Sequence, residues 1–157
     1  MHTKKIELLA PAGSFDCIQA AINGGADAIY FGVEQLNMRA KSVNAFSVDD
    51  IRQIAAACKA NGIKSYITLN TVMYDHDKQL LNSILKEVKK RKIDAVIAAD
   101  FAVIVACNHL GIPLHISTQA NISNIETVQF YARYADVVVL ARELTLKQIE
   151  QIGKEIR

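Results

Sequence analysis

Short apolar segments alternate with longer amphipathic segments along the whole chain. Runs of strand length, rich in apolar and β-branched residues, occupy Ile6–Ala10, Ala28–Phe31, Lys64–Leu69, Ala95–Ala99, Leu114–Ser117 and Val137–Leu140. Segments with the apolar spacing of a helix occupy Ser14–Asn23, Ser47–Asn61, Asp77–Lys92, Phe101–Leu110, Asn124–Tyr134 and Thr145–Glu155. A strand followed by a helix, repeated six times, predicts an α/β fold with a parallel sheet, because parallel neighbours need a crossover connection.

Local signals mark where several of these helices begin and end. Ser14, Ser47 and Asn124 stand where a side-chain oxygen can cap a helix N-terminus. Gly62 and Gly111 predict helix ends, because glycine accepts the positive φ that often follows the last helical turn. The helix boundaries are therefore expected close to those of the apolar pattern.

A short internal repeat connects helix ends with the strands that follow them. The segment Gly25-Ala26-Asp27-Ala28-Ile29 is similar to residues 93–97 and to residues 134–138. Each of the three segments contains an aspartate just before a predicted strand, namely Asp27, Asp94 and Asp136. These aspartates are expected to act in the turns between helix and strand.

Two parallel architectures fit this element order. A doubly wound sheet binds ligands mainly at one switch point, whereas a (β/α)8 barrel carries its chemistry at the carboxyl ends of many strands. Polar residues follow nearly every predicted strand, which favours the barrel. Six units are fewer than the eight that close a barrel. We therefore predict an incomplete TIM-type (β/α) barrel over residues 1–157, either a fragment of a longer protein or a sheet whose open edge another chain covers.

Composition places the chain among ordinary globular domains. Its 157 residues are 51% hydrophobic and 22% charged, and the formal net charge is +2. That balance does not indicate a partner selected by charge alone, such as nucleic acid or a membrane surface. No apolar run reaches the length of a membrane span, and the basic start lacks the apolar core of a signal peptide. A cytoplasmic protein without a membrane partner is expected.

The three cysteines do not form a metal-binding pattern. Cys17, Cys58 and Cys107 lie 41 and 49 residues apart, whereas structural metal sites use short ligand spacings. Each cysteine falls in an apolar helical pattern, so each is expected to pack as a small hydrophobic side chain. The chain itself is therefore predicted to hold no metal.

Polar side chains at the ends of the predicted strands form the candidate site. Alternation along a strand groups them on shared faces: Tyr66, Thr68 and Asn70; His115, Ser117 and Gln119; Val138, Leu140 and Arg142. The ligand-binding candidates are Arg39, Asn70, Asp100, His115, Ser117, Gln119, Arg142 and Glu143. Arginine suits bidentate contacts with a carboxylate, so the set predicts a pocket for a small anionic ligand. The alternative is an ion pair in which Arg142 and a carboxylate tie neighbouring strands together.

His115, Ser117 and Asp100 also invite comparison with a serine hydrolase. Residues two apart on one strand are separated by roughly 6–7 Å at the backbone, whereas a nucleophile and its base need about 3 Å. The sequence has neither a GxSxG nor an HExxH motif. We therefore expect His115 to be a hydrogen-bonded residue of the barrel interior rather than a catalytic base.

Two further charged features have structural interpretations. Glu7 lies in the first predicted strand and is expected to be a buried, paired acid. A basic cluster spans residues 86–92, at the end of a helix, where cations favour the helix dipole. A solvated helix end is the expected role of this cluster, and contact with RNA is the alternative.

Six sequence blocks, spread over the whole chain, occur in an order found in one protein family. They are Glu7-Leu8-Leu9-Ala10-Pro11-Ala12-Gly13-Ser14, Gly25-Ala26-Asp27-Ala28-Ile29-Tyr30-Phe31-Gly32, Asn37-Met38-Arg39-Ala40, Tyr66-Ile67-Thr68-Leu69-Asn70, Ser117-Thr118-Gln119 and Leu140-Ala141-Arg142-Glu143-Leu144. With these blocks the chain resembles the collagenase-like peptidase family, peptidase family U32. Each block alone is weak, but the set is specific.

The resemblance implies a TIM-type barrel that is followed, in longer members, by further domains. Members were named for collagenase-like proteolysis, and others are implicated in hydroxylating RNA bases, including 5-hydroxyuridine in tRNA, or ubiquinone precursors. The hydroxylating members hold an iron–sulfur cluster with cysteines beyond the Ala-Arg-Glu-Leu block, and prephenate is a proposed hydroxyl source. This sequence ends before such cysteines, so a cluster is expected only in a longer form. The chain alone is expected to be inactive.

The residues and the resemblance together predict one function and leave open one alternative from a different class. The conventional label is a peptidase or hydrolase, whereas we expect the chain to bind a small anionic ligand within an RNA-base hydroxylation protein. RNA would then be contacted through the full-length form. The alternative is a non-catalytic binding or assembly module, with a second copy or another partner chain covering the open edge of the sheet.

Overall fold

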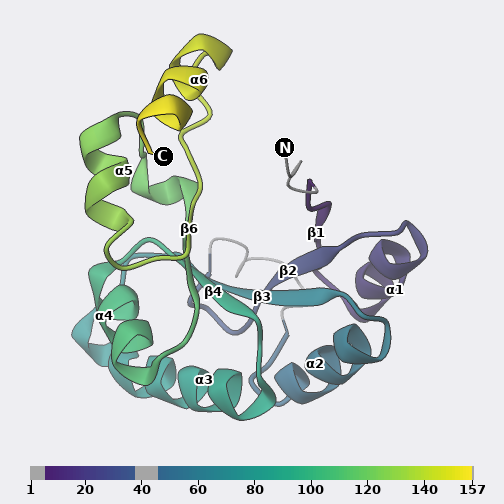
Figure 1. Ribbon diagram of the computed structural model, residues 1–157. Coiled ribbons are helices and arrows are strands. Elements are labelled where there is room, and N and C mark those ends of the chain that lie inside the picture. The colour runs from purple at the N-terminus through teal and green to yellow at the C-terminus, as the bar shows by residue number, and fades with distance from the viewer. Residues whose placement is uncertain (1–5, 38–45, 157) are drawn as a thin grey trace.

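The described residues, 6–37 and 46–156, form six parallel strands that pair in chain order in a computed structural model (Figure 1). The strands are β1 (Leu9–Pro11), β2 (Ala28–Gly32), β3 (Lys64–Leu69), β4 (Ala95–Ala98), β5 (Leu114–Ile116) and β6 (Val137–Val138). The α-helices are α1 (Phe15–Asn23), α2 (Asp50–Ala60), α3 (Lys78–Arg91), α4 (Phe101–Leu110), α5 (Ile125–Tyr131) and α6 (Leu146–Glu155). Two 3-10 turns, η1 (Asp75–Asp77) and η2 (Thr118–Ala120), follow β3 and β5.

The sheet curls into a half-barrel with the helices on its convex side. In Figure 1 the helices surround the sheet from outside, and β1 and β6 lie on either side of an opening. Among the described residues, no further strand pairs with the outer edge of β1 or of β6. The predicted incomplete (β/α) barrel of about six units is thus confirmed.

The two faces of the sheet carry different side chains. On the convex face, buried strand residues such as Phe31, Ile67 and Ile116 belong to one core with Ile54 and Leu85 from the helices. Burial of each such side chain contributes roughly 1.5–3 kcal/mol. The concave face carries a smaller apolar cluster: Ala28, Tyr66 and Ala95, with Tyr30 and Ile97 packed against them. The period-two sorting expected for the third strand is therefore observed.

Most of the expected helix boundaries are found, but α5 ends at Tyr131 rather than at Tyr134, and the start of α2 differs. Ser14 Oγ and Asn124 Oδ1 cap α1 and α5 by accepting backbone N–H groups three residues ahead. Helix α2 begins only at Asp50, so Ser47 is not its cap. Instead the Asp50 carboxylate accepts from the backbone N–H and the hydroxyl of Ser47 at 2.7 and 2.8 Å. Gly111 ends α4 with a φ of 63°, as the positive-φ signal predicted.

The repeated aspartates join neighbouring strands at their amino ends. Asp27, which precedes β2, accepts the backbone N–H of Leu8 at 2.9 Å. Asp94, which precedes β4, accepts the N–H of Ser65 at 2.8 Å and its hydroxyl at 3.0 Å. Asp136, which precedes β6, accepts the N–H of Leu114 at 2.9 Å. The predicted turn role is confirmed, and the tertiary structure adds that each aspartate holds the preceding strand.

The last two strands are shorter than the apolar pattern predicts. Strand β5 ends at Ile116, because the Ser117 hydroxyl accepts the backbone N–H of Gln119 and turns the chain into η2. Strand β6 ends at Val138 rather than at Leu140. In the described part of the chain, no helix is both long and apolar enough to cross a membrane.

Candidate functional site

A cavity of about 450 Å³ lies on the concave face, at the carboxyl ends of the strands. Its walls come from β1 to β4 and from the segments that follow β3, β5 and β6. The lining residues are Leu9, Tyr30, Thr68, Asn70, Ile97, Ser117, Thr118, Gln119, Val139 and Arg142. The position agrees with the barrel architecture, in which carboxyl-end loops form the site.

Four of the candidate residues line this cavity: Asn70, Ser117, Gln119 and Arg142. Alternation places Asn70 correctly, because β3 stays extended up to Leu69 and Thr68 lines the same cavity. Gln119 reaches the cavity from the turn η2 rather than from a strand. The four side chains therefore converge as expected, but not all for the expected reason.

The expected phase of the sixth strand is wrong. Val138 and Leu140 pack against the core on the helix side of the sheet, whereas Val139 lines the cavity together with Arg142. Period-two alternation holds only while the backbone is extended in a strand. Because β6 ends at Val138, the alternation from Val138 does not carry through to Arg142.

Ser117 connects three parts of the cavity wall. Its side chain is buried, and its Oγ accepts from Asn70 Nδ2 and from the Gln119 backbone N–H, both at 3.3 Å. Asn70 follows β3 and Gln119 lies in η2, so one hydroxyl joins segments that are 47 residues apart in sequence. Thr68 donates its hydroxyl to the Phe31 carbonyl at 3.1 Å and so ties β3 to β2.

Arg142 has no ion-pair partner in the described part of the chain. Neither of the two acidic candidates, Asp100 and Glu143, pairs with it. Asp100 caps α4: its carboxylate accepts the backbone N–H groups of Ala102 at 2.8 Å and Met73 at 3.1 Å. Glu143 is exposed and does not line the cavity. Within residues 6–37 and 46–156, no carboxylate therefore ties Arg142 to a neighbouring strand.

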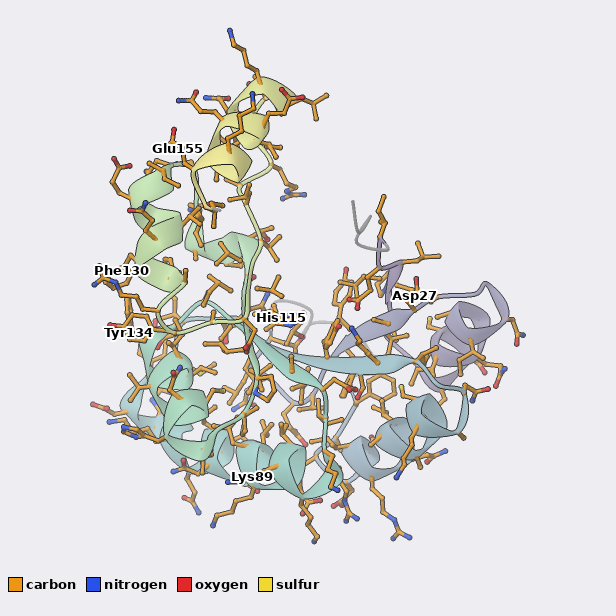
Figure 2. All side chains as sticks on the ribbon, viewed as in Figure 1. Asp27, Lys89, His115, Phe130, Tyr134 and Glu155 are labelled. Atoms are coloured by element: carbon orange, nitrogen blue, oxygen red, sulfur yellow. The ribbon has the colours of Figure 1, made fainter. Side chains whose placement is uncertain are left out.

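His115, another described candidate, is not among the residues that line the cavity. His115 lies on the concave side of the sheet (Figure 2), with its ring centroid 4.7 Å from that of Tyr66. Burial lowers the pKa of His115, so its imidazole is neutral near pH 7. The hydroxyl of Ser117 is hydrogen-bonded to Asn70 and Gln119 rather than to His115, and the Asp100 carboxylate caps α4. Asp100, His115 and Ser117 therefore do not form a catalytic triad. Arg39 lies outside the described residues.

Glu7 forms a charged group with Lys64 and Tyr66 on the concave face, and only part of the expectation for Glu7 is met. Glu7 accepts from Lys64 Nζ at 2.6 Å and from the Tyr66 hydroxyl at 2.8 Å. Glu7 is paired as expected but is not buried, since its side chain is 34% exposed and it precedes β1. The Lys64 hydrogen bond lowers the pKa of Glu7, while burial raises the pKa of Tyr66 to about 12. At neutral pH the Glu7 carboxylate therefore accepts hydrogen bonds from the Lys64 ammonium and from the neutral Tyr66 phenol.

Sequence reasoning missed much of the apolar cavity wall. Tyr30, Ile97 and Val139 line it although no polar signal singles them out. For Tyr30 and Ile97 a signal was available, because each is in register with a residue of the same face: Tyr30 with Tyr66, and Ile97 with Thr68. Period-two counting on β2 and β4 would have found both.

The described residues contain no group of three or more histidine, cysteine or acidic side chains that could hold a metal ion. Cys58 and Cys107 are buried in the core, from α2 and α4. Cys17 is exposed on α1, so the expectation that it packs as a core residue is wrong. These separated thiols do not fit an iron–sulfur cluster.

Curated relatives match nearly the whole chain. "Collagenase" of Porphyromonas gingivalis is 48% identical over 99% of this chain and 38% of its own length. "tRNA hydroxylation protein P1" of Bacillus subtilis is 32% identical over 98% of this chain and 37% of its own length. "23S rRNA 5-hydroxycytidine C2501 synthase" of Escherichia coli is 33% identical over 97% of this chain and 23% of its own length. The chain thus spans less than two fifths of each of these relatives.

Solved structures share the fold. A U32 peptidase, Mk0906, has a TM-score of 0.77 at 14% identity and covers 100% of this chain and 69% of that chain. The phospho-2-dehydro-3-deoxyheptonate aldolase of Thermotoga maritima has a TM-score of 0.61 at 12% identity over 94% of this chain and 48% of that chain. At such identities the likeness concerns the fold alone. The sequence profile of peptidase family U32 matches residues 13–157. The chain therefore belongs to peptidase family U32.

Proposed function

We propose that this chain is the part of an RNA-base hydroxylation protein that binds a small anionic ligand. The observation that carries the proposal is the cavity at the carboxyl ends of the strands, where Arg142 lies with Asn70, Ser117 and Gln119. Its volume of about 450 Å³ falls within the usual range for small-molecule sites, roughly 300–1,000 Å³. A guanidinium without an ion-pair partner in residues 6–37 and 46–156 favours an anion as the occupant.

The relatives support a hydroxylation role more than proteolysis when the residues are considered with them. Relatives carry both kinds of name, collagenase at 48% identity and tRNA hydroxylation protein at 32% identity. The side-chain geometry favours the second kind, because Asp100, His115 and Ser117 are used in three separate contacts. RNA would be bound by a longer form of the protein, and such a role would place it in the cytoplasm.

Replacing Arg142 by alanine is expected to weaken the binding of malonate and inorganic phosphate roughly 10- to 100-fold. A hydrogen bond to a charged group contributes about 1.5–3 kcal/mol, which corresponds to that loss. Isothermal titration calorimetry or ligand-observed NMR on this chain measures the affinities. Lys90→Ala is the matched control, because Lys90 pairs with Glu87 on α3 and does not line the cavity. Equal losses in both variants, or no binding by the unmodified chain, would contradict the proposal.

The open edges of the sheet support a second candidate, an assembly module that needs a partner chain. Leu9 on β1 is 41% exposed and Val137 on β6 is 43% exposed, and uncovered strand edges promote association. We therefore expect this chain to form a dimer or a larger assembly, with a second copy covering an edge.

Analytical ultracentrifugation at low micromolar concentration tests this assembly. Val137→Lys should shift the mass to that of a single chain, because a charge at a strand edge disfavours pairing. Val72→Lys is the control, since Val72 is also an exposed valine, at 67% against 43% for Val137, but lies in the segment after β3. A single-chain mass for the unmodified protein would speak against the expectation.

A further inference from the structure

We propose that Ser117 is a specificity-determining residue that donates its hydroxyl proton to an acceptor oxygen of the ligand, so that the cavity selects carboxylates over neutral amides. This inference rests on the proposed binding of a small anion in the cavity lined by Asn70, Ser117, Gln119 and Arg142. In this inference the buried hydroxyl of Ser117 contacts the ligand directly, and the chemical class that it favours is the carboxylates.

The hydroxyl of Ser117 has one hydrogen bond left to donate. A serine side chain has a single proton to donate and two lone pairs that can accept. Both lone pairs of Ser117 are used, one by Asn70 Nδ2 and one by the Gln119 backbone N–H, each at 3.3 Å. What remains is the proton, and it must point away from both donors.

The surroundings of Ser117 direct that proton toward the cavity. The residue is only 3% exposed, so bulk water does not surround the hydroxyl. Within the described ranges, no protein oxygen accepts from Ser117 Oγ. Ser117 lines the cavity at the carboxyl ends of the strands. A buried donor without a protein acceptor carries a desolvation cost that a ligand oxygen relieves.

Arg142 supplies the second donor on the same cavity. A guanidinium donates through its N–H groups and cannot accept. Thr68 does not compete as a donor, because its proton is given to the Phe31 carbonyl at 3.1 Å. Ser117 from the end of β5 and Arg142 from beyond β6 thus offer donors to a ligand with two acceptor oxygens. A carboxylate has that character, whereas the –NH₂ group of an amide would meet another donor.

The same geometry makes Ser117 a poor nucleophile. A nucleophilic serine gives its proton to a base and attacks through a lone pair. Here both lone pairs accept hydrogen bonds, and accepting them polarises the O–H bond and strengthens it as a donor. The residue that a hydrolase interpretation would choose as the nucleophile is therefore better suited to holding an anion.

Binding of malonate and malonamide to the unmodified chain and to Ser117→Ala tests the inference. The unmodified chain should bind malonate at least tenfold more tightly than malonamide. Malonate carries negative charge toward the Arg142 guanidinium and has only acceptor oxygens at each end, whereas each end of malonamide is neutral and has an –NH₂ donor in place of one oxygen. Ser117→Ala should lose about tenfold in malonate affinity and little in malonamide affinity, so that the discrimination shrinks. Ser83→Ala is the matched control, a serine exposed on α3 that does not line the cavity.

Each outcome either supports the inference or overturns it. Equal affinity of the unmodified chain for the two ligands would overturn it, as would unchanged discrimination in a folded Ser117→Ala. Loss of binding in Arg142→Ala with none in Ser117→Ala would leave the proposed function standing and remove Ser117 from it. Failure of the unmodified chain to bind malonate would remove both. If Ser117→Ala does not fold, Ser117→Cys replaces it, since a thiol is a weaker donor and malonate binding should fall.

Discussion

Replacing Gly32 by alanine is expected to destabilise the protein by about 2–4 kcal/mol, the sum of overpacking and of buried groups left without partners. Gly32 ends β2, and a Cβ atom there would overlap the side-chain amide of Asn37. Asn37 is 3% exposed, and its Nδ2 donates to the carbonyls of Val33 and Glu34, both at 3.1 Å. Asn37 cannot move aside without breaking these hydrogen bonds.

Thermal unfolding followed by circular dichroism measures the effect. A chain of this length loses roughly 2–4 °C in melting temperature per kcal/mol, so Gly32→Ala should melt roughly 5–15 °C lower. Gly13→Ala is the matched control: nothing lies within 4 Å of a Cβ atom at Gly13, and its φ is not in the left-handed region. If both variants melted at the same temperature, the close contact between Gly32 and Asn37 would be disproved.

Iodoacetamide is expected to alkylate Cys17 alone in the folded protein at pH 7.5. The reagent attacks thiolates, and the Ser14 hydroxyl lowers the pKa of the exposed Cys17 thiol by donating to its Sγ at 3.3 Å. Burial raises the pKa of Cys58 from 9.0 to about 11 and that of Cys107 to about 12. These shifts reduce their thiolate fractions by factors on the order of a hundred and a thousand, and burial also blocks the reagent.

Peptide mass spectrometry over a time course distinguishes the three thiols. All three should react at similar rates once guanidinium chloride unfolds the chain, which serves as the internal control. Ser14→Ala should slow the alkylation of Cys17, because the hydrogen bond that favours the thiolate is lost. Alkylation of Cys58 or Cys107 in the folded protein at the rate of Cys17 would contradict the structure.

Local pattern was sufficient to predict the elements and the fold class. The bounds of β3 and α4 agree with the apolar pattern, since polar residues or glycine mark where the apolar run ends: Asn70 follows β3, and Asp100 and Gly111 flank α4. The N-caps at Ser14 and Asn124 were visible because a cap depends on residues three positions apart. The alternation of strands and helices implied a parallel sheet, because each crossover needs its helix. The polar residues that follow nearly every strand favoured the barrel over the doubly wound sheet. The position of Asn70 at the cavity followed from counting along one continuous strand.

Contacts between distant segments decided what the sequence by itself could not. The Asp100 carboxylate accepts a hydrogen bond from the backbone N–H of Met73, 27 residues away, rather than lining a ligand site. Ser117 became the centre of the cavity wall through Asn70, 47 residues away. Arg142 turns toward the cavity because β6 stops early, and where a strand stops depends on its pairing with β5 as well as on its own residues. Periodicity describes neighbours along the chain; the site is made by residues that only the curled sheet brings together.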